Sequence, residues 1–107
     1  MGEVMLDTKM VNNTRAKCYE YYFVGELAAF VDYKLHDRVL SLIHTEVIPQ
    51  FEGKGMAATL VRGILDEATA EGLQVLPYCT YVSGFISKHR DEYLELVPAG
   101  RRIDFSL

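Results

Sequence analysis

The stretch RVLSLIHTEVIPQFEGKGMAATLVRGILDEATAEGLQVL, residues 38–76, contains the pattern that decides the fold. Its first part, 38–48, alternates with a period of two, which is typical of a strand, and its last part, 74–76, is a short apolar run that Pro77 ends. Between them, apolar residues recur with the spacing of one face of an amphipathic helix: Met56, Leu60, Val61, Ile64, Leu65 and Ala68. A strand–helix–strand unit of this kind is normally a right-handed parallel crossover.

The residues before this unit predict two more strands. Aromatic residues indicate a strand at about 16–24, and a second period-two pattern indicates a strand at 26–35, which a short turn joins to 38–48. These three strands are expected to form an antiparallel meander. Residues 1–15 are mixed and polar, and no strand is predicted there.

The residues after the unit predict helices. One helix is expected from about Thr80, whose side chain would cap it, to about residue 89, and a shorter one over about 90–96. The elements together predict an α/β (α+β) fold, with a mixed sheet of an antiparallel meander plus one parallel strand, packed with two to three helices. No linker or repeat divides the chain, so residues 1–107 are expected to form one domain.

Composition excludes several classes of protein. The chain has 11 basic and 15 acidic residues and a net charge of −4, without the basic stripe of a nucleic-acid-binding module. Its two cysteines, Cys18 and Cys79, make neither a disulfide framework nor a zinc site, and no metal is expected.

The remaining compositional expectations concern location and assembly. No apolar segment approaches the roughly 18 residues of a membrane span, and no signal peptide is visible, so we expect a soluble cytoplasmic protein without a membrane partner. The tyrosine-rich strand at 16–24 is expected at an exposed sheet edge, where it could support a dimer. The chain is therefore expected to be a monomer or a weak dimer.

Two explanations compete for the glycine-rich turn between the strand and the helix, Gln50 to Gly55. Either the turn only needs glycines for positive φ, or it is an anion site, because the first amides of a helix are unpaired and attract negative charge. The known phosphate loops do not match. A P-loop needs Lys and then Ser or Thr after its last glycine, and a dinucleotide fingerprint needs a third glycine at position 58, which is Ala.

A third pattern does match. The spacing Q/R-x-x-G-x-G/A, met by Gln50, Gly53 and Gly55, resembles the coenzyme A pyrophosphate loop of the GNAT superfamily of N-acetyltransferases. The wider stretch 42–89, with His-Thr-Glu-Val before the loop and Pro-x-Cys-x-Tyr-Val after the next strand, is similar to small single-domain GNAT-like enzymes of the YjdJ type. The resemblance covers roughly residues 16–97.

The resemblance implies acetyl-CoA as co-substrate and a pose for it. The backbone amides of the turn would hold the pyrophosphate; these belong to Phe51, Glu52, Gly53, Lys54, Gly55 and Met56. The pantetheine arm would pair like an extra strand near Val47 and Ile48, with the thioester between that strand and 74–76. Lys54, Lys88 and Arg90 are candidates for the phosphates of the nucleotide, although each also fits an ordinary solvated surface charge.

Acetylation of an amine needs a base. A lysine-type amine with a pKa of about 10.4 is mostly protonated at pH 7, which costs the nucleophile roughly 4–5 kcal/mol. Glu46 is the best-placed carboxylate, late on the strand that leads to the loop, and the alternation puts it on one face with His44, Leu40 and Leu42. Larger GNAT enzymes often have a glutamate in this region. Glu46 and His44 are therefore candidate catalytic residues, and exposed or structurally paired side chains are the alternative.

Cys79 is a candidate nucleophile and a candidate contact of the pantetheine arm. It follows the strand at 74–76, where the resemblance places the thioester, and precedes the helix that starts near Thr80. A thiol near a helix N-terminus ionises more easily than usual, and acetyl transfer from CoA sulfur to a cysteine is close to isoenergetic. Most free cysteines are small buried hydrophobes, and Cys18 is expected to be one.

Three functions remain open at this stage. The first is an N-acetyltransferase acting on an unidentified amine, either a small amine or a protein lysine or N-terminus. The second is an acetyl-CoA-binding module or sensor with little turnover. The third is an acidic interaction domain in which the glycines only form a turn. Larger GNAT enzymes enclose the acceptor with additional helices and strands, so the acceptor side of this chain is expected to be open.

Overall fold

The computed structural model describes residues 7–107, so residues 1–6 of the polar N-terminal segment lie outside the described part. A five-stranded sheet has its strands in chain order, with three antiparallel pairs and one parallel pair, β4 with β5. The strands are β1 (Thr8–Asn13), β2 (Cys18–Phe23), β3 (Glu26–His36), β4 (Val39–Val47) and β5 (Gln74–Pro77). The predicted mixed sheet is confirmed.

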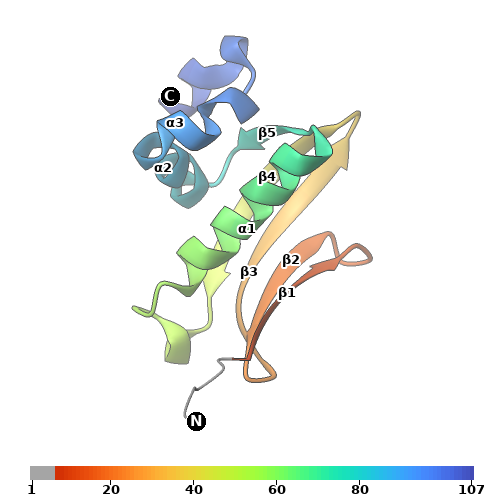
Figure 1. Cartoon of the computed structure of the whole chain (residues 1–107), viewed down its shortest axis with the longest axis vertical. Helices are drawn as coiled ribbons and strands as arrows, with labels where there is room; N and C mark the ends of the chain where they lie inside the picture. Colours follow the sequence, from red (N-terminus) through yellow and green to blue (C-terminus); the bar gives the residue numbers. More distant parts are fainter. Residues whose placement is uncertain (1–6) are drawn as a thin grey trace.

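Three α-helices and three short 3-10 turns complete the described chain. They are η1 (Pro49–Phe51), α1 (Met56–Glu71), α2 (Thr80–Lys88), α3 (Arg90–Tyr93), η2 (Leu94–Leu96) and η3 (Ala99–Phe105). Figure 1 shows α1 lying along one face of the sheet, while α2, α3 and the C-terminal turns gather beyond the end of β5. The helices at about 80–89 and 90–96 are confirmed within the usual uncertainty of helix ends.

The core lies between α1 and the inner face of the sheet. The apolar stripe of α1 packs on β2, β3 and β4, and Leu60, Val61, Ile64 and Leu65 are fully buried. Burial at this level is worth about 1.5–3 kcal/mol for each large side chain. Helix α1 connects β4 to β5, and its packing on the sheet holds these two parallel strands side by side.

The first strand, β1, was not predicted, and the expected exposed edge at 16–24 is wrong. Thr8–Asn13 pairs with β2 along its whole length, so β2 is an interior strand and β1 forms the edge. The sequence TKMVNN is too polar to give a strand signal. Tertiary packing stabilises this strand although its sequence has no alternating pattern, because the Met10 side chain lies against Gly63 of α1.

A β-bulge changes the predicted faces of β4. The pairing with β3 shifts between Asp32–His44 and Tyr33–Leu42, which leaves Ile43 without a partner. Because one extra residue inverts the alternation, Leu42 faces the core while His44 and Glu46 are exposed. The prediction that His44 and Glu46 share a face is confirmed, and the prediction that Leu40 and Leu42 share it with them is wrong.

A polar cluster fixes α3 against α1. The Tyr93 hydroxyl donates to Asp66 at 2.6 Å, and Arg62 pairs with Glu92 at 3.1 Å while lying over the Phe85 ring at 5.6 Å. Burial, together with the hydrogen bond to Asp66, raises the pKa of Tyr93 to about 12. The α2–α3 junction is therefore held beside the second turn of α1.

The hairpin between β2 and β3 contains a strained valine that offers a test of the fold. Val24 and Gly25 have φ of 48° and 79°, the pattern of a type I′ turn, and Val24 is 60% exposed. A β-branched residue is unfavourable there, whereas Asn accepts this conformation. We expect Val24→Asn to raise the free energy of unfolding by about 1 kcal/mol, measured by urea denaturation. Val24→Ala, which lacks the local preference of Asn, should gain less. An Asn variant no more stable than the Ala variant would contradict the assigned turn.

Candidate functional site

The candidate site lies where β4 and β5 separate. Their parallel pairing ends at Leu42 and Pro77, and the last backbone link is the Cys79 amide, which donates to the Leu42 carbonyl at 3.0 Å. Beyond this point β4 continues to Val47, while the chain after β5 turns into α2. The second half of β4 and the start of α2 are therefore not paired by strand hydrogen bonds, and we call the region between them the gap.

Backbone groups of β4 point into this gap. The Ile48 amide donates to Ala28 of β3 at 2.8 Å, so it faces β3 and not the gap. Antiparallel strands alternate in direction, and the N–H and C=O groups of Val47 and Thr45 therefore point away from β3. Of the two residues predicted to lie near the pantetheine arm, Val47 therefore has backbone groups that point into the gap, whereas the amide of Ile48 points to β3.

Cys79 lies at the mouth of the gap. It is the N-cap residue of α2, so the prediction of Thr80 in that position is wrong by one residue. Its Sγ lies 3.2 Å from the Thr45 hydroxyl. Partial burial raises the pKa of the thiol, but the Thr45 hydroxyl and the amides of Val82, Tyr81 and Thr45 outweigh it, so the pKa lies below the ordinary value. Thr45 lies in the His-Thr-Glu-Val stretch that carries the family resemblance, but no role was predicted for it from the sequence.

The second cysteine provides a contrast. Cys18 is buried in the sheet, and burial together with nearby Asp32 raises its pKa to about 11. The prediction that Cys18 is a core residue is confirmed. Of the two thiols, only Cys79 is in a position where the thiolate is favoured.

The glycine-rich turn leads from β4 to α1. Gly53 and Gly55 have φ of 79° and 76°, and Gly55 is the N-cap of the helix. The Phe51 and Glu52 amides donate within the η1 turn, to Ile48 at 2.8 Å and Pro49 at 3.2 Å. The set of amides free for an anion therefore narrows from the predicted 51–56 to Gly53 and the residues after it, through the first turn of α1.

Side chains of the turn anchor it to the β2–β3 hairpin. The Gln50 amide donates to Glu26 at 2.9 Å, and the buried Phe51 ring lies edge-on to Phe23 with centroids 5.9 Å apart. In this structure Gln50 and Phe51 position the turn. Lys54 lies at its exposed tip between the two glycines.

The candidate base and its neighbour lie on the outer face of β4. The Nε2 atom of His44 and the Oε1 atom of Glu46 are 3.1 Å apart, and the two side chains are 57% and 52% exposed. The bulge at Ile43 places them just beyond the point where β4 and β5 separate. Together they can accept a proton from a group that approaches the gap from the outer face.

The other two cations predicted to bind the nucleotide, Lys88 and Arg90, lie at the α2–α3 junction and not at the turn. Lys88 ends α2 and Arg90 begins α3, and both are exposed. Their junction contacts α1 through Arg62, which lies roughly 10 Å along the helix axis from Gly55. No contact described for residues 7–107 brings either cation to the turn.

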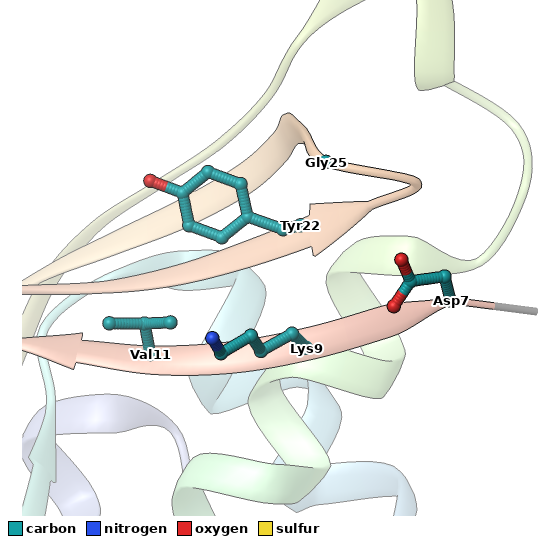
Figure 2. Close-up of a pocket in the computed structure, with 5 residues that line it drawn as sticks. All are labelled: Asp7, Lys9, Val11, Tyr22 and Gly25. Atoms are coloured by element: carbon teal, nitrogen blue, oxygen red, sulfur yellow. The ribbon is translucent and has the colours of Figure 1, made fainter.

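A large open hollow on the described residues lies away from the gap. A hollow of about 470 Å³ lies on the outer face of β1 and β2, lined by Asp7, Lys9, Val11, Tyr22 and Gly25 (Figure 2). A smaller one, about 210 Å³, lies along α2 beside Tyr81 and Lys88. The gap differs from these hollows in its chemistry, because the Cys79 thiol, the unpaired backbone of β4 and the His44–Glu46 pair lie beside it.

The C-terminal segment, which the sequence analysis left without a role, supports β5. The Arg101 guanidinium donates to the Tyr78 hydroxyl at 3.2 Å, and the Phe105 ring packs edge-on against Tyr78 at 5.3 Å. Tyr78 is therefore engaged by η3. Tyr81, in the first turn of α2, remains 43% exposed.

A family model described as GCN5-related N-acetyl-transferase matches residues 18–96, most of the chain. The chain belongs to this family. The match confirms the resemblance to the GNAT superfamily. The fold agrees with it: the crystal structure of the ribosomal-protein-S18-alanine N-acetyltransferase from Escherichia coli superimposes with a TM-score of 0.55 at 14% identity. That likeness covers 66% of this chain and 64% of the enzyme, so the chain spans about two thirds of its length.

Within residues 7–107 of this GNAT domain, none of the helices has the length and apolar character needed to cross a membrane.

The lowered pKa of Cys79 can be tested by alkylation. The thiolate is the reactive form, so iodoacetamide should modify Cys79 with a midpoint pH below that of an ordinary cysteine, and Cys18 should not react below its pKa of about 11. Thr45→Val removes a hydrogen bond to the thiolate and should shift the midpoint to higher pH. Peptide mapping by mass spectrometry at a series of pH values measures both. An unchanged midpoint in the variant would show that Thr45 does not stabilise the thiolate.

Proposed function

We propose that this chain is an acetyl-CoA-dependent N-acetyltransferase that acts on an amine. The observation that supports this function best is the order of three groups: free backbone amides, an unpaired strand edge and a thiol. The order runs from the amides at Gly53–Gly55, along the unpaired edge of β4 at Val47 and Thr45, to the Cys79 thiol. A nucleotide phosphate, an extended amide-containing arm and a thioester occur in this order in acetyl-CoA.

In the proposed pose, each part of acetyl-CoA meets a matching group. The pyrophosphate accepts hydrogen bonds from the amides of Gly53, Lys54, Gly55 and Met56, where the helix dipole of α1 adds partial positive charge. The amides of the pantetheine arm pair with Thr45 and Val47 as a further strand would. Lys54, between the two glycines, is the cation nearest to the phosphates in this pose.

Acetyl transfer then follows from the groups on β4. The acceptor amine loses its proton to Glu46, directly or through His44, and attacks the thioester carbonyl. The carbon–sulfur bond breaks and the acetyl group remains on nitrogen. The coenzyme A thiolate leaves near the hydroxyl of Thr45 and the amides at the start of α2, which stabilise its charge. It then takes the second proton of the attacking nitrogen, so the products are the neutral amide and the coenzyme A thiol, and Glu46 returns the first proton to water.

A second route through Cys79 uses the same site. The Cys79 thiolate attacks the thioester carbonyl, coenzyme A leaves as a thiolate, and the amine takes the acetyl group from Cys79. The lowered pKa of Cys79 favours this route. Intact mass after exposure to acetyl-CoA separates the two, because only the second route leaves an acetyl adduct that is absent from Cys79→Ala.

Binding is the first test. Gly53→Val adds side-chain bulk where the amides approach the pyrophosphate, at a φ of 79° that only glycine adopts freely. We expect calorimetry to show acetyl-CoA affinity reduced at least about tenfold in the variant. Gly72→Val is the control, because Gly72 also has a positive φ, 69°, but lies at the opposite end of α1 from the turn. Equal loss in both variants, or no binding by the folded wild type, would contradict the proposed nucleotide site.

Turnover is the second test. Removal of a general base usually costs about 10²–10⁴ in rate, so we expect Glu46→Gln to lower kcat by at least about 10²-fold at pH 7. Acetyl-CoA affinity should be unchanged, and the loss should shrink at high pH as the amine deprotonates by itself. Glu95→Gln, an exposed charge on η2, is the control. Full activity in Glu46→Gln would remove Glu46 from the mechanism.

The competing function is an acetyl-CoA-binding module with little turnover. The exposure of His44 and Glu46 favours it, since nothing in the described structure encloses an acceptor beside them. Such a module would bind acetyl-CoA in the first test and release no coenzyme A on addition of any amine in the second.

A further inference from the structure

The first strand of the sheet, β1, is paired on one side only. The Val24 amide donates to the Asp7 carbonyl at 2.7 Å, so the backbone of Asp7 faces β2. Backbone direction alternates along an antiparallel pair, and the N–H and C=O groups of Thr8, Met10 and Asn12 therefore face away from β2. Within residues 7–107, no second strand pairs with β1 and no further backbone hydrogen bond reaches these three residues. The open side of β1 thus presents a row of donors and acceptors.

This edge has little of the protection that edge strands usually have. Such strands are commonly protected by a proline, a bulge, a lysine or a covering helix. Of these devices β1 has only Lys9, and its pairing with β2 runs from Thr8 to Asn13 without a register shift. Helix α1 packs on β2, β3 and β4, and Figure 1 shows β1 as the outermost strand of the sheet. The described chain therefore leaves room for another strand beside β1.

We propose that β1 is a self-association edge, which pairs antiparallel with β1 of a second copy of this chain about a two-fold axis at Met10. In this register Thr8 faces Asn12 of the second copy, and the two Met10 residues face each other. Every N–H and C=O group on the open side of these three residues then has a partner. The inference does not depend on the proposed acetyltransferase function, because β4 and β5, beside the candidate site, lie at the other side of the sheet.

The side chains favour this register over its neighbours. Asp7, Lys9 and Val11 lie on the outer face, where they line the hollow of about 470 Å³ shown in Figure 2. In the proposed pairing Lys9 lies opposite Val11 of the second copy, so its aliphatic stem covers that side chain while the ammonium stays in water. A shift of two residues in one direction would place Lys9 opposite Lys9. A shift in the other direction would place Thr8 opposite Thr14, which lies in the β1–β2 turn.

A second copy is the occupant that the strand itself specifies. The pairing is isologous, so one surface serves both molecules and each contact occurs twice. A contact confined to a strand of six residues is small beside the roughly 1,200–2,000 Å² that stable interfaces bury. The dimer is therefore weak and reversible, with a dissociation constant on the order of 0.1 mM.

Hydrogen exchange of single amides, measured by NMR, tests the pairing directly. Protein at about 0.02 mM and about 1 mM lies on either side of the expected dissociation constant. The amides of Thr8, Met10 and Asn12 should exchange about fourfold more slowly at the higher concentration, which is the ratio of the free monomer fractions. The amides of Lys9 and Val11 are internal controls, because they already face β2 and should change little.

Two substitutions at one exposed position separate strand pairing from loss of a side chain. Thr8→Pro removes an N–H group on the open side, so it blocks the second copy and leaves the hydrogen bonds to β2 in place. Thr8→Ala keeps that N–H group and is the matched control. At about 1 mM, sedimentation velocity should show dimer in the wild type and in Thr8→Ala, and monomer in Thr8→Pro. Circular dichroism and thermal denaturation establish that both variants are folded.

Three results would overturn the inference. The first is exchange at Thr8, Met10 and Asn12 that does not depend on protein concentration. The second is a wild type that remains a monomer at about 1 mM. The third is a dimer that persists in folded Thr8→Pro, since its contact would lie elsewhere. None of these measurements involves acetyl-CoA, so failure of the proposed function would leave them unchanged.

Discussion

One backbone hydrogen bond, from the Cys79 amide to the Leu42 carbonyl, sets the geometry on which the site depends. Up to this bond β4 and β5 are paired strands, and after it each has a free side. On β4 the next residue, Ile43, is a bulge, and the bulge turns His44 and Glu46 to the outer face. On the other strand the next residues start α2, whose first amides surround the thiol. The pairing of β4 with β5 therefore ends beside both the His44–Glu46 pair on β4 and the Cys79 thiol at the start of α2.

The sequence allowed the central unit to be predicted because its signals are local. The stripe of α1, the glycines at positions 53 and 55 and the alternation of 26–35 each follow from neighbouring residues. The strand β1 could not be predicted this way, because the polar TKMVNN becomes a strand only by pairing with β2 and packing Met10 on α1. Membership of the GNAT family was likewise visible in the turn, while its acceptor was not.

The errors within the site have one physical origin. The alternation along 38–48 was extended without interruption, and a single unpaired residue, Ile43, inverts it. That inversion explains why Leu42 is buried beside an exposed His44, and why the contact of Thr45 with Cys79 was missed. The bulge leaves no trace in the hydrophobicity of the sequence, since Ile43 is as apolar as Leu42 before it. Sequence patterns therefore predicted the strand and the turn themselves, but not which face of β4 each side chain occupies.

The order of the strands has a consequence for how the molecule forms. The sheet order follows the chain order, so β1 to β4 pair through short hairpins, which close quickly. The contact between Thr45 and Cys79, by contrast, joins residues 34 apart and needs α1 to be complete and packed. The N-terminal meander can thus assemble as the chain leaves the ribosome, whereas the gap exists only once the last third of the chain has docked. A partly synthesised or C-terminally damaged chain would retain much of its sheet and lack the candidate site.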